Sequence, residues 1–242
     1  MKRLIFIISI FICIQNFASD QLYKQGNEQY ANENYSIAIS LYDSIINTGL
    51  ESSEIYYNLG NCYYKSKDWA NAIWHYEKSL KLNSNEKTIN NLELVRLKII
   101  DSIEPLPQLF FKNWWGNLSQ TFSTKSWQIL ALLSVGFILI LQLINKYTSL
   151  KRIPIIKTLS TITLIIFFIA ETSYQNNFTK KEAIIFHETI TVNSAPNVNS
   201  TNLFTLHEGT KVEIIDVIGD WINIKIVNGN RGWIKDQSVK EL

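Results

Sequence analysis

Two long apolar runs joined by a short basic loop constrain this 242-residue chain more than any other feature. The first run, residues 127–144, has no charged residue, and as a helix rising about 1.5 Å per residue it spans roughly 27 Å, close to the hydrocarbon core of a bilayer. The second run, residues 153–170, has one charge, Lys157, near its start, where an ammonium can reach the headgroups. The runs predict a transmembrane helical hairpin; the alternative is a buried helical hairpin in a soluble domain.

The loop between the runs, residues 145–152, predicts the orientation of this hairpin. It holds Lys146, Lys151 and Arg152 and no acidic residue, and short basic loops stay in the cytoplasm. Both long flanking arms then lie on the opposite side of the membrane. We therefore expect a protein of the bacterial inner membrane with both long arms in the periplasm.

The N-terminal residues 1–19 have the pattern of a signal peptide. Lys2 and Arg3 precede an apolar run over residues 4–14, and the small residues Ala18 and Ser19 follow. Cleavage or retention as an additional membrane helix are both open, and either exports the chain from residue 20 onward. Cys13 also suggests a lipoprotein, although Ile12 is larger than the small residue that usually precedes a lipidated cysteine.

An internal repeat of 34 residues follows the leader, in residues 20–98. A period of 34 made of two helices is the signature of tetratricopeptide repeats, and residues 54–85 resemble that family. The next segment, residues 86–99, has the apolar spacing of a capping helix, so residues 20–100 predict an all-α tetratricopeptide solenoid. Two repeats with a cap are few for a solenoid, so we expect the array to lean on a partner or on the membrane. The pairs at this offset are Gly26/Gly60, Asn27/Asn61, Tyr30/Tyr64, Tyr35/Trp69, Ala38/Ala72, Ile39/Ile73 and Tyr42/Tyr76.

One stripe on the first helix of each repeat predicts a peptide-binding groove. Asparagine can hydrogen-bond to the backbone of an extended peptide, and tyrosine offers flat contact area. The alternative is that these are ordinary solvated helix residues preserved by the duplication. The predicted groove residues are Tyr23, Asn27 and Tyr30 in the first copy and Tyr57, Asn61, Tyr64 and Lys65 in the second.

Aromatic residues are dense in the segment 101–126, between the repeats and the first apolar run. Pro105 and Pro107 end the preceding helix, and the aromatics after them recur at helical spacing. Such a segment beside a membrane helix predicts an interfacial amphipathic helix; a partner-binding helix is the alternative. The predicted membrane-interface residues are Phe110, Phe111, Trp114, Trp115 and Trp127.

The last segment, residues 182–242, predicts a small all-β barrel. It consists of short β-branched or alternating runs, and Asn228-Gly229 is a strong hairpin-turn signal. The order VNSAP, LHEGTKVEIID and DWINIKIVNGNRGWI resembles bacterial SH3-like domains. That resemblance implies binding of peptides or cell-wall material. Trp221 could then belong to the ligand site or to the core, whereas we expect Trp233 in the core.

No pattern in the sequence indicates catalysis. The three histidines are scattered and the two cysteines are far apart, so no metal-ligand spacing, phosphate loop or nucleophile elbow occurs. A net charge of +2 is too small to indicate nucleic-acid binding. We expect a protein that is not an enzyme and that uses no cofactor and no metal.

The order of these segments resembles the BatE-type aerotolerance proteins across essentially the whole mature chain. The stretch NNLELVRLKIIDSIEPLPQLFFKNWW and the run SAP…LHEGT…W…NGNRGWI carry the likeness best. The resemblance implies a non-enzymatic envelope scaffold that works with von Willebrand A-type membrane proteins and a MoxR-type AAA ATPase. A receptor that binds a cell-wall ligand, peptidoglycan or peptide, through the SH3-like domain is the alternative function.

Overall fold

The computed structural model describes residues 19–107, 110–147, 153–175 and 180–242. These residues form two compact units. One unit joins the described chain up to Glu104 to Glu182–Leu242, and the other lies within Pro105–Lys181. The signal peptide expected over residues 1–19 lies outside the described residues except for Ser19. The two arms that flank the apolar hairpin in the sequence therefore belong to a single unit.

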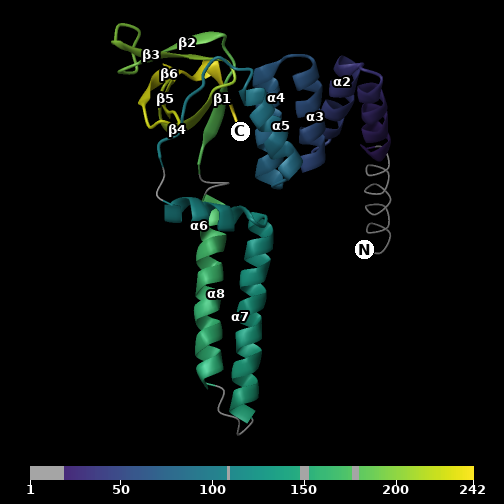
Figure 1. Cartoon of the computed structure of the whole chain (residues 1–242), viewed down its shortest axis with the longest axis vertical. Coiled ribbons are helices and arrows are strands. Elements are labelled where there is room, and N and C mark those ends of the chain that lie inside the picture. The colour runs from purple at the N-terminus through teal and green to yellow at the C-terminus, as the bar shows by residue number, and fades with distance from the viewer. Residues whose placement is uncertain (1–18, 108–109, 148–152, 176–179) are drawn as a thin grey trace, which may run out of the picture. The chain divides into compact units, whose positions relative to one another are not determined.

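The N-terminal arm is an array of five described helices, in antiparallel succession (Figure 1). Side chains cap three of them: Ser52, Asp68 and Asn85 each accept a backbone N–H from the first turn that follows. The described helices are residues 19–31, α2 (Tyr35–Ile46), α3 (Ser53–Lys65), α4 (Trp69–Leu82) and α5 (Glu86–Arg96).

The 34-residue period is visible in how the helices pack. A Cβ added to Gly26 would lie 2.6 Å from the ring of Tyr42, and one added to Gly60 would lie 2.5 Å from the ring of Tyr76. Both tyrosines are fully buried. Each glycine is therefore the place where a tyrosine of the second helix packs directly on the backbone of the first, and the predicted helical repeat is confirmed.

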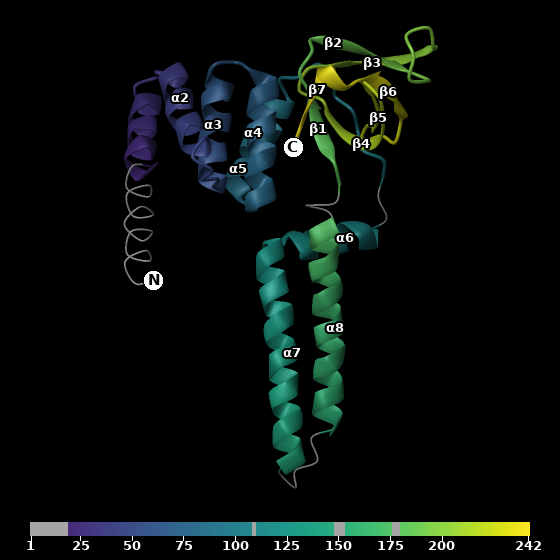
Figure 2. The ribbon, with the colours of Figure 1, turned by 180° about the vertical axis from the view of Figure 1, so that it is seen from behind.

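The C-terminal arm is a seven-stranded antiparallel sheet (Figure 2). Its order is β3-β2-β6-β5-β4-β1-β7, and inward residues such as Ile222, Ile224 and Ile234 fill its core. Gly229, with φ at 88°, lies in the turn between β5 and β6, as the Asn-Gly signal predicted. The strands are β1 (Glu182–Ile185), β2 (Thr189–Asn193), β3 (Asn202–His207), β4 (Lys211–Ile218), β5 (Trp221–Lys225), β6 (Arg231–Lys235) and β7 (Val239–Glu241).

The sheet packs directly on the end of the helical array. Ile184 of β1 is fully buried in one cluster with Ile73 of α4 and Leu92 and Val95 of α5. The indole Nε1 of Trp74 donates to the carbonyl of Glu241 over 2.8 Å. Helices and sheet thus share an apolar core, and the two arms cannot separate without exposing it.

A buried carboxylate joins the helices to the sheet at this contact. The side chain of Glu77 on α4 is 7% exposed and accepts from Lys211 of β4 over 2.9 Å and from Arg96 of α5 over 2.8 Å. Burial alone would raise the pKa of Glu77, but the two cations outweigh burial and hold the pKa below its usual value. The carboxylate is therefore charged and doubly paired in the folded unit.

A second carboxylate, Asp101, fixes the chain that follows α5 to the sheet. It accepts from the backbone N–H of His207 over 2.7 Å and from the hydroxyl of Thr210 over 2.6 Å. Burial alone would raise the pKa of Asp101, but the hydrogen bonds from Thr210 and His207 lower it below its usual value. Gly209 turns the chain here with φ at 84°, and its backbone lies close to the side chain of Ile99. A Cβ added to Gly209 would lie only 2.6 Å from that side chain.

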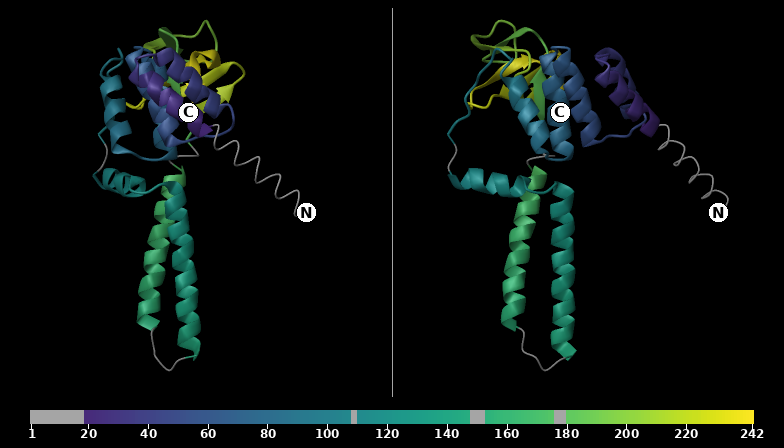
Figure 3. Two further views of the ribbon diagram at one scale, coloured as in Figure 1. Left: turned by 90° about the vertical axis from the view of Figure 1, so that its right-hand side faces the viewer. Right: turned by 45° about the vertical axis from the view of Figure 1, so that its right-hand side comes forward.

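The second unit contains α6 (Phe110–Gln120), α7 (Thr124–Tyr147) and α8 (Ile153–Tyr174). Helices α7 and α8 lie side by side, with α6 across one end (Figure 3). Two helices, Thr124–Tyr147 and Ile155–Tyr174, are long and apolar enough to cross a membrane, and few of their residues are buried within the protein. The predicted runs 127–144 and 153–170 lie inside α7 and α8, while most of the predicted basic loop, residues 148–152, lies outside the described residues.

Acid should weaken the contact between the sheet and the helices, because the pKa of Glu77 and that of Asp101 are both lowered on folding. A carboxyl with a lowered folded pKa stabilises the fold above its unfolded pKa, about 4.5 for glutamate, and loses that contribution as the pH falls through the folded pKa. We expect Glu77→Gln to lower the free energy of unfolding at pH 7 by about 3 kcal/mol, since two cations lose their carboxylate.

Urea denaturation of the full chain in detergent, followed by tryptophan fluorescence, measures this effect. The loss of stability between pH 5 and pH 3 should be shallower in Glu77→Gln than in the natural chain. Glu28→Gln, at an exposed carboxylate of the helix over residues 19–31, is the matched control and should leave both quantities unchanged. An unaltered pH dependence in Glu77→Gln would contradict the role assigned to this carboxylate.

Candidate functional site

The structure brings the two predicted groove stripes together on neighbouring helices. Tyr23, Asn27 and Tyr30 lie on the helix over residues 19–31, and Tyr57, Asn61, Tyr64 and Lys65 lie on α3. Asn58 of α3 donates to the hydroxyl of Tyr23 over 3.2 Å, so the two helices touch along this side. We call these seven residues the tyrosine–asparagine face.

Hydrogen bonds hold the two asparagines of this face in the same way. The Oδ1 of Asn27 accepts from the Tyr42 hydroxyl over 2.7 Å and from Asn58 over 3.0 Å. The Oδ1 of Asn61 accepts from the Tyr76 hydroxyl over 2.7 Å and from Asn91 over 2.9 Å. Each asparagine thus links its own repeat to the next one.

The tyrosine donors in these bonds remain protonated. Burial raises the pKa of the Tyr42 hydroxyl and that of the Tyr76 hydroxyl. A phenol with a raised pKa keeps its proton at physiological pH and donates it to the asparagine oxygen. The two amide planes are therefore fixed in orientation.

The asparagines are consequently more than solvated surface residues. Their oxygens are used inside the array, but within the described part of the chain the Nδ2 of neither Asn27 nor Asn61 donates a hydrogen bond. Asn27 is exposed and Asn61 is half-buried. Both can offer N–H donors to a ligand while their orientation is fixed by the fold.

The tyrosines beside them are half-buried and held by ring contacts. Tyr30 meets the edge of Tyr35 with centroids 5.6 Å apart, and Tyr64 meets the edge of Trp69 at 5.7 Å. Their remaining surface is flat and presented without loss of side-chain freedom on binding. Lys65 is exposed at the end of α3.

Sequence reasoning missed Asn58 and Asn91, the two donors that complete this pattern. They occupy the same place in successive repeats, but they are 33 residues apart and not 34, because α4 and the link after it are together one residue shorter than α2 and its link. A search allowing this shift would have aligned α5 with α3. The resulting alignment shows that α5 is the first helix of a third, incomplete repeat.

A second candidate surface lies on the outer face of the sheet. Trp221 of β5 pairs with Lys235 of β6, whose Nζ lies 5.2 Å from the centroid of the indole. Trp233 of β6 pairs with Asn193 and Asn223. Our expectation that Trp233 belongs to the core is wrong: it is half-buried and lies outside the core cluster, because the buried neighbours on its strand, Gly232 and Ile234, point to the other face.

The two asparagines beside Trp233 have buried oxygens without a donor. Neither the Oδ1 of Asn193 nor that of Asn223 accepts a hydrogen bond from the described residues, and Asn193 is 8% exposed. An unmet buried acceptor costs about 1–3 kcal/mol. These oxygens are closed to solvent, so the surface that this row presents consists of the half-buried indoles of Trp221 and Trp233.

Comparison with known families matches two parts of the chain to two kinds of domain. Residues 53–86 match the tetratricopeptide repeat, and residues 189–240 match the bacterial SH3 domain. No curated protein matches the chain. Both kinds of domain are typically non-catalytic binding modules, so binding of proteins or of cell-wall material is the function that both matches suggest.

The predicted membrane-interface residues divide into two sets in the second unit. Phe110, Phe111 and Trp114 are 83%, 51% and 64% exposed on α6. Trp115 and Trp127 instead bind α6 to the hairpin: one donates to the hydroxyl of Thr172 and the other to the carbonyl of Ser119, each over 3.1 Å. These bonds fix α6 on the hairpin, so its three exposed aromatics form a rigid apolar surface.

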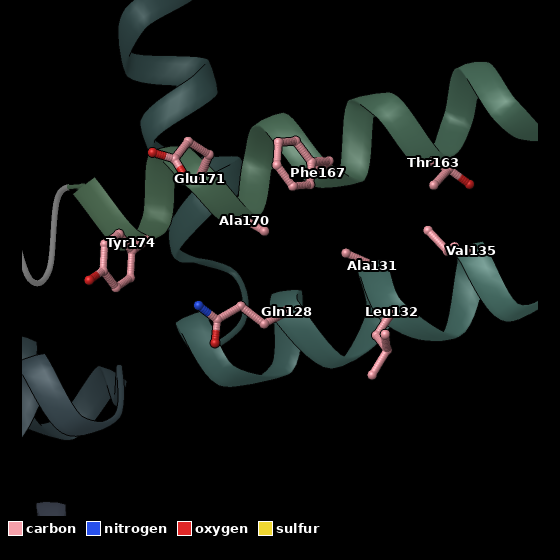
Figure 4. Close-up of a pocket in the computed structure, with 9 residues that line it drawn as sticks. All are labelled: Gln128, Ala131, Leu132, Val135, Thr163, Phe167, Ala170, Glu171 and Tyr174. Carbon is pink, nitrogen blue, oxygen red and sulfur yellow. The ribbon is translucent and has the colours of Figure 1, made fainter.

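A groove of about 460 Å³ runs between α7 and α8 (Figure 4). Its walls are mostly apolar, and Gln128, Glu171 and Tyr174 lie toward one end of it. Nothing in this lining resembles a catalytic arrangement. The full lining is Gln128, Ala131, Leu132, Val135, Thr163, Phe167, Ala170, Glu171 and Tyr174.

Cys62 and His75 are buried in the helical array, where their side chains contribute to packing. Burial raises the pKa of the Cys62 thiol to about 12, so it stays protonated. Burial also lowers the pKa of His75 to about 4, and its neutral ring stacks on Tyr63 with centroids 4.8 Å apart. Among the described residues no group of three or more histidine, cysteine, aspartate or glutamate side chains could hold a metal ion.

Proposed function

We propose that this protein is a membrane-anchored periplasmic scaffold that binds partner proteins of an envelope aerotolerance or stress complex. The observation that carries the proposal is the tyrosine–asparagine face, where Asn27 and Asn61 present N–H donors at equivalent places in successive repeats. Extended peptides are recognised through main-chain hydrogen bonds and side-chain contacts of this kind. The SH3 domain, packed on the same unit, adds a second binding surface.

The hairpin of α7 and α8 is the anchor in this proposal. Lys146 and the other basic residues of the loop 145–152 favour a cytoplasmic loop, which leaves both arms in the periplasm. The exposed aromatics of α6 suit the headgroup region. The resemblance to BatE-type proteins names von Willebrand A-type membrane proteins and a MoxR-type AAA ATPase system as the partners.

Reporter fusions test the proposed orientation. A reporter that is active only in the periplasm should work when fused after residue 100 or after residue 242 and should be silent when fused after residue 148. A reporter that is active only in the cytoplasm is the control and should show the reverse pattern. Periplasmic activity of the fusion at 148 would rule out the hairpin with a cytoplasmic loop.

Site-specific photocrosslinking in the native bacterium tests the scaffold function. A photoreactive phenylalanine in place of Tyr64 should form an adduct with a von Willebrand A-type membrane protein, because Tyr64 lies on the tyrosine–asparagine face. The same residue in place of Ile37, which is 51% exposed on α2 and outside that face, is the matched control. Equal adducts at both positions, or none at Tyr64, would argue against a scaffold that works through this face.

A receptor for cell-wall material is the second candidate function. It is favoured by the outer face of the SH3 domain, where the half-buried indoles of Trp221 and Trp233 lie on the neighbouring strands β5 and β6. Sugars and short peptides have apolar faces that stack on indole. This candidate uses a surface separate from the tyrosine–asparagine face.

Co-sedimentation of the full protein with purified peptidoglycan tests this candidate. We expect Trp221→Ala to weaken binding about tenfold, the equivalent of about 1.4 kcal/mol of lost aromatic contact. Val227→Ala, at a residue of the same domain that is 54% exposed, is the control and should bind as the natural chain does. If peptidoglycan does not sediment the natural protein, the receptor function is excluded.

A further inference from the structure

The third, incomplete repeat shows which residues of α5 continue the tyrosine–asparagine face. Asn91 of α5 donates to the Tyr57 hydroxyl over 3.2 Å and to Asn61 over 2.9 Å, as Asn58 of α3 does to Tyr23 over 3.2 Å and to Asn27 over 3.0 Å. The two helices thus dock on their predecessors in the same register, 33 residues apart.

Burial follows the same register. Leu92 and Val95 are buried in α5, as Leu59 and Cys62 are at the equivalent places of α3. The shared spacing agrees with the hydrogen bonds, so the equivalence holds for both the polar and the apolar side of the helix. The equivalence between α3 and α5 can therefore be extended to the neighbouring positions of the two helices.

In this register, Leu94 takes the place of Asn61 and Leu97 takes the place of Tyr64. Leu94 is 51% exposed and Leu97 is 79% exposed. The face therefore changes character along the array: two rows of asparagine and tyrosine are followed by a row of two exposed leucines. The third row thus offers apolar surface at the places where the first two rows offer amide and phenol groups.

A missing second helix of the repeat does not account for these leucines. Where Gly60 allows Tyr76 to pack on the backbone of α3, α5 has Glu93, whose carboxylate binds Arg96 over 3.0 Å. A helix carrying a tyrosine at that position could not pack equally closely on α5. The chain instead continues from α5 to the contact of Ile99 with Gly209 of the sheet arm.

Basic residues lie beside the leucines at equivalent positions. Lys65 at the end of α3 and Lys98 after α5 are both exposed and stand in the same register. An acidic side chain next to an apolar one in the ligand would complement Lys98 and the two leucines together. Surface pairs of this sort serve mainly to orient a ligand.

We propose that the tyrosine–asparagine face and the leucine pair Leu94/Leu97 together bind one extended peptide segment of a partner, with a large apolar residue of that segment over the leucines. This inference rests on the proposed function and specifies its ligand. The amides of Asn27 and Asn61 donate to carbonyls of the segment. Packed helices are spaced by about 8–10 Å, and an extended chain rises about 3.3 Å per residue, so the apolar residue lies about three residues from the one bound at Asn61.

Peptide display on the full protein tests the inference. A library of random 15-residue peptides is selected on the protein in detergent, and binding of the enriched peptides is measured by fluorescence polarisation. The enriched peptides should share one large aliphatic or aromatic residue with acidic residues next to it. The double substitution Leu94→Asn with Leu97→Tyr, which copies the second row onto the third, should weaken their binding tenfold or more, because it removes both leucines that would bury the apolar residue of the peptide.

Two further variants separate the possible outcomes. Ile89→Asn, at a residue of α5 that is 42% exposed and outside the leucine pair, is the matched control and should bind as the natural chain does. Asn61→Asp keeps the acceptor oxygen for Tyr76 and Asn91 but removes the amide donor, so it tests the proposed function alone. The midpoint of urea unfolding shows whether each variant is folded.

Each result has a definite meaning. Peptides that need Asn61 but are indifferent to the leucine substitutions leave the proposed function intact and overturn this inference. A library that yields no peptide dependent on either position overturns both. If the natural protein sediments as a dimer and the leucine variant as a monomer, without peptide binding, the leucine pair is a contact between two copies of the chain and the inference is likewise overturned.

Discussion

The buried carboxylate of Glu77 is the interaction on which the larger unit depends. A lone buried charge is strongly unfavourable, and the carboxylate of Glu77 is tolerated because Lys211 and Arg96 both reach it within 3 Å. The two cations come from opposite sides of the contact, one from the sheet and one from the last helix. Their pairing makes the position of the SH3 domain on the array specific, whereas the apolar cluster around Ile184 makes it favourable.

This contact fixes the relative position in which the two arms can bind a ligand. As separate modules on one anchor, they would sample many relative positions, and a ligand that bound both would have to order them. Held together by a shared core, they present the tyrosine–asparagine face and the outer face of the sheet at fixed separation. A partner that contacts both surfaces must therefore match their separation as well as their chemistry.

The sequence was sufficient for the parts of the fold that depend on local spacing. The repeat of Gly26 and Gly60 required a close helix crossing, and the turn at Asn228-Gly229 required a hairpin; both follow from neighbouring residues. The contact of Glu77 with Lys211 could not be read in this way, because the two residues are 134 positions apart and an ion pair leaves no periodic pattern. Asn91 was missed because α4 and its link are together one residue shorter than α2 and its link, which broke the 34-residue offset that revealed Asn61.

The same separation along the chain has a consequence for biosynthesis. A ribosome completes Glu77, Ile73 and Leu92 well before it reaches Ile184 and Lys211, and the apolar hairpin of α7 and α8 is made in between. The helical array therefore emerges with an open apolar end and a carboxylate that lacks one of its two cations. Completion of this unit waits for the last sixty or so residues, so a chain truncated or stalled within the hairpin carries a conspicuous defect that quality-control proteases can recognise.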